Sequence, residues 1–152
     1  MIIYEGPGDL FVCRMQCLIC TVNTVGAMGK GIALRFRDEV PGLYQFYRQR
    51  YNDVPPEYPS VNRLEVFALT PRKKVLLFPT KDHWRFPSKL WMIQQNLAQL
   101  AECYEELCID SLGLPLIGCG VRTGQLSWEH QVRPLVYQYL DPLPIPVKIM
   151  MD

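Results

Sequence analysis

Histidine, charge imbalance and long apolar runs are scarce in this sequence, and each absence excludes a class of protein. Two histidines among 152 residues leave few ligands for a zinc site. No apolar stretch reaches the ~18 residues that a membrane-spanning helix requires. The net charge of +1 argues against a protein that coats long nucleic acid through its overall field. The first residues lack the basic and apolar segments of a secretory signal, so we expect a soluble protein of a reducing compartment.

Cysteine occurs six times, yet its spacing predicts neither disulfides nor a metal site. Cys17 and Cys20 form an isolated C-x-x-C pair within CLICTV, a run typical of a strand. Residues three positions apart on a strand point to opposite faces, so the two thiols are poorly placed to share one metal ion. We therefore predict buried thiols here, and no metal or cofactor for the protein.

The length and the apolar pattern predict one α/β domain over residues 1–152. The composition is that of an ordinary globular protein, with 49% hydrophobic and 20% charged residues. Short strand-like runs alternate with longer helix-like runs, which is typical of a layered fold around a largely buried sheet. The strand candidates are residues 1–5, 17–22, 63–70, 74–79, 108–115 and 146–151, and the helix candidates are residues 31–40, 41–51, 88–104 and a segment starting near 127.

Two serines mark the expected starts of the later helices. Ser88 precedes an apolar stripe that ends at Tyr104, and Ser127 precedes a stripe that ends at Tyr139. Ser88 is therefore predicted as a helix N-cap, and the last helix is predicted to start near Ser127. The polar, proline-rich stretch 51–62 is predicted as a surface loop.

The stretch NTVGAMGKGIA, residues 23–33, joins a predicted strand to a predicted helix and contains three glycines. Gly26, Gly29 and Gly31 permit positive φ and close approach of the backbone, and a helix N-terminus favours an anion. Ligands of layered α/β folds lie at the loops that leave the carboxyl ends of strands. A phosphate-bearing ligand is therefore predicted, although a tight turn without a ligand would have the same pattern.

A second glycine-rich stretch, GCGVRTG at residues 118–124, also follows an apolar strand and strengthens the phosphate interpretation. The first stretch lacks the spacing of a P-loop, and in the second the third glycine falls one place too late for G-x-G-x-x-G. Asn23 stands at the end of the first strand. Its carboxamide can donate to and accept from a ribose hydroxyl, but an Asx-type turn is an equal alternative.

The motifs GDLF, VNTVGAMGKGIALRF, FPTKDHWRFPSKL and LPLIGCG together resemble the macrodomain family over nearly the whole chain. The resemblance is closest to DarG-type antitoxin macrodomains, which reverse ADP-ribosylation of thymidine in single-stranded DNA. It implies a three-layer α/β/α fold with a mixed, mostly parallel sheet. It also implies a monomeric ADP-ribosyl glycohydrolase of the bacterial cytoplasm, encoded by the cell or by a phage.

The resemblance also implies roles for individual residues. Asp9 would bind the adenine amino group, although without the motif a turn carboxylate before a cap would be the preferred interpretation. The two glycine loops would wrap the diphosphate, and Asn23 would face the distal ribose as a catalytic residue. Lys81 matches the catalytic lysine of these macrodomains. The implied ADP-ribose contacts are Asp9, Leu10, Thr24, Gly26, Met28, Gly29, Gly31, Ile32, Pro115, Ile117, Gly118, Cys119, Gly120 and Val121.

Lys81 would attack the anomeric carbon or stabilise the departing group, and attack requires a free amine. Desolvation or nearby positive charge would lower its pKa, with Arg85 as a local contributor. Without the motif, an exposed lysine at a strand end would be the simpler interpretation.

His83, Trp84 and Arg85 follow Lys81 closely and are predicted to contact nucleic acid. An aromatic ring there can stack on a splayed base while Arg85 meets a phosphate. Basic residues also gather along this part of the sequence, which would add local attraction, although such runs are often only solvated turns. They are Arg72, Lys73, Lys74, Lys81, Arg85 and Lys89.

Two features depart from the family pattern. Some lysine-dependent relatives carry an aspartate shortly after the second glycine loop, whereas this sequence has no acid there before Glu129. Arg122 and Gln125 stand in that region instead and suggest contact with a phosphate or another edge of the substrate. The chain also stops with the macrodomain, so we expect no C-terminal region for binding a toxin.

The leading prediction is removal of ADP-ribose from a nucleobase, with ADP-ribose or ADP-ribosylated single-stranded DNA as the partner and no membrane association. The alternative is a module that binds ADP-ribose or a related nucleotide without turnover. Lys81 beside Asn23 favours the enzyme, whereas the missing acid favours the binding module. Phosphatase action on ADP-ribose 1''-phosphate ranks last, because His83 is the only nearby candidate nucleophile.

Overall fold

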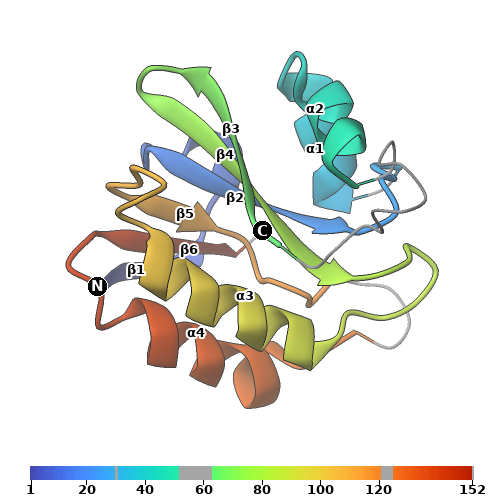
Figure 1. Cartoon of the computed structure of the whole chain (residues 1–152). Coiled ribbons are helices and arrows are strands. Elements are labelled where there is room, and N and C mark those ends of the chain that lie inside the picture. The colour runs from blue at the N-terminus through green and yellow to red at the C-terminus, as the bar shows by residue number, and fades with distance from the viewer. Residues whose placement is uncertain (30, 52–62, 121–124, 152) are drawn as a thin grey trace.

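The protein folds into three layers, with a six-stranded sheet between two pairs of helices (Figure 1). The computed structural model describes residues 1–29, 31–51, 63–120 and 125–151. The strands are β1 (Ile2–Pro7), β2 (Cys17–Asn23), β3 (Glu65–Thr70), β4 (Lys73–Lys81), β5 (Leu112–Leu114) and β6 (Val147–Met151). The helices are α1 (Gly31–Glu39), α2 (Leu43–Tyr51), α3 (Leu90–Cys103) and α4 (Arg133–Leu140), with a 3-10 turn η1 (Leu10–Val12) and a π-helical turn η2 (Trp128–Val132).

The sheet is mixed and mostly parallel, as predicted. Its strand order is β1-β6-β5-β2-β4-β3. Every neighbouring pair is parallel except β3 and β4, which pair antiparallel at one edge. The carboxyl ends of the five parallel strands therefore lie along the same edge of the sheet.

Each predicted strand is present, but β5 is shorter than its apolar run. The prediction covered residues 108–115, whereas the strand contains only Leu112–Leu114. Cys108 has a φ of +56°, in the left-handed region, just after α3 ends. The Gln16 side chain binds the Cys108 carbonyl oxygen and the Asp110 N–H. Residues 108–110 therefore lie outside the strand, in the irregular connection from α3 to β5, which the Gln16 side chain holds in place.

The alternation along β2 divides the core between the two faces of the sheet. Cys17 and Ile19 pack with α3 and α4, whereas Leu18, Cys20 and Val22 pack with α1 and α2. The expectation that Cys17 and Cys20 face opposite sides is confirmed. Burial raises the pKa of the Cys17 thiol to about 12, and burial also raises that of Cys20, so both are neutral apolar groups.

The helix starts agree with the sequence in one case and differ in the other. Ser127 caps η2, because its side chain accepts the His130 N–H, which agrees with the predicted helix start near Ser127. Ser88 is not the cap of α3: that residue is Lys89, which makes no side-chain cap bond. The Ser88 hydroxyl is buried instead and donates to the Thr80 hydroxyl at 3.4 Å. The prediction for Ser88 was wrong because a tertiary contact takes up its side chain.

The structure tests two further predictions, the surface loop and the lack of a membrane-spanning helix, only for the residues that it describes. Of the predicted surface loop 51–62, only Tyr51 lies within the described residues, and it is the buried last residue of α2. Among the residues that the structure describes, no helix is long and apolar enough to cross a membrane.

Candidate functional site

The predicted site residues gather at the edge of the sheet where the parallel strands end. Asp9 follows β1, residues 24–31 follow β2, Lys81 closes β4, and residues 115–120 follow β5. We refer to residues 24–31 as loop 1 and to residues 115–120 as loop 2. Since these strands run parallel, their carboxyl ends form the position at which layered α/β folds bind ligands.

Asn23 shapes loop 1 with its side chain. Its Nδ2 donates to the Ala27 carbonyl oxygen at 2.8 Å, and its Oδ1 accepts the Val25 and Ala27 N–H groups, each at 3.2 Å. Gly26 lies inside this turn with a φ of +83°, a conformation that glycine adopts without steric strain. The carboxamide thus makes the Asx-type turn that the sequence allowed as an alternative. Its predicted role toward a ribose stays a prediction.

Tyr47 of α2 supports Asn23 from within the core. Its hydroxyl lies 2.6 Å from the Asn23 carbonyl oxygen and 2.8 Å from Oδ1. Burial raises the pKa of Tyr47, so the hydroxyl remains a proton donor at neutral pH. The sequence predicts only a helix over residues 41–51 here and does not indicate this contact.

Lys81 lies beside Asn23 because the two residues are register partners across β2 and β4. The Thr24 N–H donates to the carbonyl oxygens of Lys81 and Asp82 at 3.1 and 3.2 Å, which fixes loop 1 against the end of β4. The predicted approach of Asn23 and Lys81 is therefore confirmed as geometry.

The Lys81 side chain is partly buried, and this burial lowers the pKa of its ammonium group. Desolvation alone accounts for that direction. Arg85, the expected contributor, is not among the causes of this shift; the carbon of its guanidinium lies over the Trp84 ring, 5.1 Å from the ring centre. A desolvated lysine provides more free amine at a given pH than an exposed one.

Asp9 is held by an arginine that sequence reasoning did not identify. Its carboxylate accepts the Phe11 N–H at 3.0 Å and both terminal nitrogens of Arg35, each at 2.8 Å. The Arg35 guanidinium, then the Phe11 N–H, hold the pKa of the Asp9 carboxyl below its ordinary value. Arg35 also pairs with Glu39 at 2.9 Å and covers the Phe11 ring at 4.2 Å. Asp9 is thus a fixed, ionised acceptor.

The glycines of the two loops leave backbone accessible from outside. Among the described residues other than the chain neighbours, none has an atom within 4 Å of a Cβ added to Gly29, Gly31 or Gly120. Gly31 has a φ of +60°, so positive φ is confirmed for Gly26 and Gly31 but not for Gly29. Open backbone of this kind permits close approach by a phosphate.

The other predicted contacts divide into core residues and loop residues. Leu10, Met28 and Ile117 are buried in the two apolar cores, and the Thr24 side chain is buried with its hydroxyl donating to the Asp82 carbonyl oxygen. Such residues can reach a ligand only through their backbone. Ile32, Pro115 and Cys119 are partly exposed, Gly118 has a φ of +72°, and Val121 lies outside the described residues together with Arg122.

Cys119 is a thiol rather than a thiolate at neutral pH. Burial raises its pKa to about 11, and its sulfur lies 3.3 Å from the Ile117 carbonyl oxygen. It therefore lacks the lowered pKa of a nucleophilic cysteine.

The basic residues of the sequence divide into two groups in space. Lys73 donates to the carbonyl oxygens of Cys13 and Met15, and Lys74 donates to those of Leu107 and Cys108. These lysines begin β4, whereas Lys81 ends it, roughly 26 Å away at about 3.3 Å per residue. The expectation that these basic residues gather in one place was wrong, because Lys73 and Lys74 lie at one end of β4 and Lys81 lies at the other.

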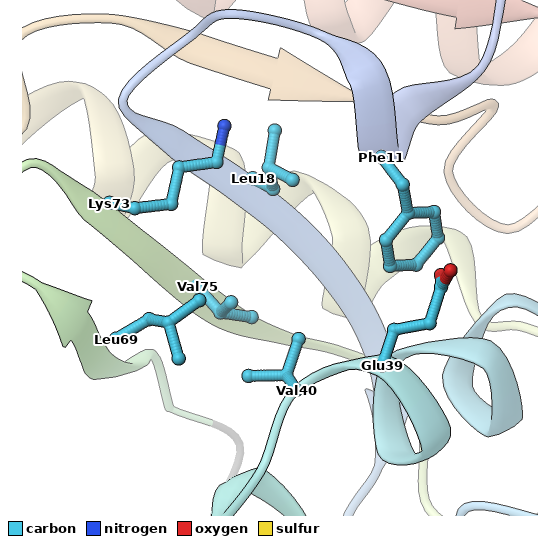
Figure 2. Close-up of a pocket in the computed structure, with 7 residues that line it drawn as sticks. All are labelled: Phe11, Leu18, Glu39, Val40, Leu69, Lys73 and Val75. Atoms are coloured by element: carbon cyan, nitrogen blue, oxygen red, sulfur yellow. The ribbon is translucent and has the colours of Figure 1, made fainter.

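A separate apolar hollow of about 270 Å³ lies on the α1 side of the sheet (Figure 2). None of the predicted site residues lines it. Figure 2 shows its lining side chains, which come from η1, β2, β3, β4 and the end of α1: Phe11, Leu18, Glu39, Val40, Leu69, Lys73 and Val75. Since the Lys73 ammonium group is bound to two carbonyl oxygens, we assign this hollow no chemistry.

Comparisons with known proteins identify the family of this chain and the proteins to which it is similar. The chain matches the Macro domain family model over residues 19–133. The DNA ADP-ribosyl glycohydrolase of Mycobacterium tuberculosis is 38% identical over 136 residues, or 90% of this chain. The solved macrodomain of Thermus aquaticus DarG has a TM-score of 0.83 and 32% identity, covering 99% of this chain and 97% of that chain.

A third relative was solved with a ligand. The structure of Thermosipho africanus DarTG in complex with ADP-ribose has a TM-score of 0.84 and 32% identity, covering 99% of this chain and 42% of that chain. This chain spans 38% of the length of the Mycobacterium tuberculosis protein. The similarity therefore concerns one part of each of these longer proteins.

Proposed function

Because the chain belongs to the macrodomain family, we propose that it is an ADP-ribosyl glycohydrolase that removes ADP-ribose from a modified base in single-stranded DNA. The observation that carries this proposal is the pairing of Asn23 with a partly buried Lys81 beside the glycine loop. The name of the Mycobacterium tuberculosis relative and the ADP-ribose complex of the Thermosipho africanus relative support it.

In this proposal, the adenosine diphosphate end of the substrate supplies the binding energy. The ionised Asp9 accepts a hydrogen bond from the adenine amino group, and the open backbone of Gly29, Gly31 and Gly120 approaches the diphosphate. This binding positions the distal ribose against the end of β4. Energy from the non-reacting end of a substrate thereby orients the reacting carbon.

Lys81 then acts at the anomeric carbon. Its free amine either attacks that carbon as the bond to the base nitrogen breaks, or stabilises the departing base and the ring-opened sugar. In the first case water releases the sugar from the lysine, and the base leaves with the bonding electron pair and gains a proton. Asn23 keeps loop 1 in place with its side chain, and its part in catalysis is to set the position of the ribose.

Mass spectrometry of a thymidine-ADP-ribosylated oligonucleotide tests the proposal. The wild-type protein is expected to remove one ADP-ribose, whereas Lys81→Ala should leave the oligonucleotide modified and still bind ADP-ribose. Full turnover by Lys81→Ala would show that the lysine is not catalytic. No turnover by the wild type, with ADP-ribose binding retained, would favour the binding module.

A module that binds ADP-ribose without turnover is the second candidate. It is favoured by the hydrogen bonds of the Asn23 carboxamide. Its nitrogen donates to loop 1, and its oxygen accepts from loop 1 and from Tyr47, so the side chain serves the structure of the loop. Phosphatase action is less well supported, because the Nδ1 of His83 accepts the Arg85 N–H and its ring stacks on Trp84. We further propose that the protein acts as a monomer in the bacterial cytoplasm.

A further inference from the structure

Large exposed aromatic rings concentrate beside Lys81. Trp84, Phe86 and Trp91 are 47%, 60% and 56% exposed, and they lie within eight residues of one another in the sequence. Two of the three tryptophans of the chain are thus among its most exposed apolar residues, while Trp128 is buried. We call residues 83–91 the aromatic segment. Exposed rings gathered beside a site indicate an interaction surface.

Three rings of the aromatic segment, those of His83, Trp84 and Phe86, lie close together around His83. His83 stacks on Trp84, with ring centres 5.1 Å apart and planes inclined by 29°. The Phe86 ring lies 5.7 Å from His83 at an inclination of 58°. Arg85 covers Trp84. The segment therefore offers planar faces with a guanidinium among them.

The structure fixes both ends of the aromatic segment. The Thr24 hydroxyl donates to the Asp82 carbonyl oxygen, and the Lys89 N–H donates to the Thr80 carbonyl oxygen at 2.7 Å. Lys89 also forms an ion pair with Asp82 across the base of the turn. Rings held on such a closed turn are positioned before a partner arrives, which lowers the entropic cost of binding.

We propose that the aromatic segment binds the bases of single-stranded DNA next to the modified nucleotide. That the bound bases lie next to the modified nucleotide rests on the proposed function, whereas strand binding itself does not. Base stacking on aromatic rings, with a nearby basic group for the phosphate, is how proteins capture single strands with little sequence preference. A double helix keeps its bases stacked on each other, so it cannot occupy these ring faces.

Binding of an unmodified strand tests this inference without any turnover. The probe is a fluorescein-labelled single-stranded oligothymidylate of about ten nucleotides, followed by anisotropy at fixed low salt. Trp84→Ala and Phe86→Ala should each weaken binding at least about fivefold. Tyr4→Ala, which removes an exposed ring from β1 at the far edge of the sheet, should bind as the wild type does.

The same probe annealed to its complement should bind clearly more weakly than the single strand. Equal affinity for duplex and single strand, unchanged affinity in both ring variants, or no saturable binding by the wild type would each overturn the inference. A thermal unfolding temperature and an ADP-ribose affinity equal to the wild type show that Phe86→Ala remains folded. Failure of the proposed function is seen separately, as absence of turnover by a wild-type protein that still binds the strand.

Discussion

At the scale of single residues, the partial burial of Lys81 predicts how the rate of ADP-ribose removal depends on pH. The buried ammonium group is disfavoured, so the pKa falls below its ordinary value of 10.5. The free amine therefore becomes available as pH rises through the lowered pKa. We expect single-turnover rates to rise with pH to a plateau whose midpoint lies below 10.5, as measured across a buffer series.

Two substitutions separate the amine from the charge at this position. Lys81→Ala removes both, whereas Lys81→Arg keeps a positive charge but has no free amine near neutral pH. If the amine attacks, both variants should lose roughly 10²- to 10⁴-fold in rate. A Lys81→Arg variant with near wild-type rates would instead assign the residue to electrostatic stabilisation.

Arg35 is predicted to control ADP-ribose binding through Asp9. Its guanidinium fixes both carboxylate oxygens and keeps the pKa of Asp9 low. In Arg35→Ala the carboxylate is no longer held in position, so binding should weaken about tenfold. The pKa of Asp9 should also rise, so that binding is lost at a higher pH than in the wild type as the solution is acidified. Calorimetric titration of ADP-ribose at several pH values measures both effects.

The matched control for this prediction is Arg37→Ala. Arg37 lies two positions further along α1, where its guanidinium covers the Tyr44 ring at 4.2 Å and has no contact with Asp9 among the described interactions. This variant should bind ADP-ribose as the wild type does. An Arg35→Ala variant with an unshifted pH profile would mean that Arg35 does not act through Asp9.

The sequence predicts the residues of the site better than the residues that hold them. Lys81 and Asn23 stand in motifs at strand ends, so their meeting follows from strand order. Tyr47 and Arg35 lie 24 and 26 positions from their partners, and only the packing of α1 and α2 brings them there. No local pattern encodes such contacts, and the sequence predicts only that both residues lie within helices.

At the scale of elements, loop 2 contains two glycines that serve different purposes. Gly118 has a φ of +72°, and an added Cβ would lie 2.6 Å from the Ile93 Cδ1 of α3. Gly118→Ala should therefore destabilise the fold by about 1 to 3 kcal/mol. Gly120 faces open space, so Gly120→Ala should keep the stability and weaken ADP-ribose binding.

Urea unfolding and ADP-ribose titration of both variants check this contrast. The expected pattern is a lowered unfolding midpoint for Gly118→Ala, and a wild-type midpoint with reduced affinity for Gly120→Ala. Equal affinities of the wild type and Gly120→Ala would remove the backbone of Gly120 from the binding surface.

Periodicity predicts the existence of elements, whereas tertiary contacts set their limits. The apolar run 108–115 indicates a strand, but β5 contains only Leu112–Leu114, and the Gln16 side chain binds the backbone of Cys108 and Asp110 instead. Serine is a residue type typical of helix N-caps, but the Ser88 hydroxyl donates a hydrogen bond to the Thr80 hydroxyl instead. In both cases the competing partner is distant in the sequence, so the local pattern carries no sign of it.

At the scale of the whole molecule, Glu5 joins the first strand to the last helix. Its carboxylate accepts bonds from the Arg133 Nε at 2.8 and 3.0 Å, the Tyr137 hydroxyl at 2.5 Å and the Trp128 indole nitrogen at 3.2 Å. Its side chain is only 15% exposed. This cluster fixes η2, which follows the second glycine-rich stretch, against the edge strand β1, so loss of the carboxylate charge should affect global stability.

The pH dependence of unfolding tests this role. Hydrogen bonding from Arg133, opposed by burial and aided by Tyr137 and Trp128, lowers the pKa of Glu5 from 4.5 to about 2. The resulting stability, about 2 to 3 kcal/mol, is fully present above pH 4.5 and is lost as pH falls toward 2. Glu5→Gln should therefore be less stable than the wild type at pH 7, and the two should converge near pH 2.

Urea unfolding measures this convergence when it is carried out at three pH values: pH 7, pH 4.5, which is the ordinary pKa of the Glu5 carboxyl, and a pH near 2. Glu39→Gln is the control, because Glu39 forms an exposed pair with Arg35 within one helix and such pairs contribute about 0.3 to 0.5 kcal/mol. If the difference between the wild type and Glu5→Gln stayed constant from pH 7 to pH 2, the effect would come from packing around β1 and α4. A difference that closes only below pH 4.5 assigns the stabilisation to the ionised carboxylate, because protonation would then make the wild type equivalent to the uncharged variant.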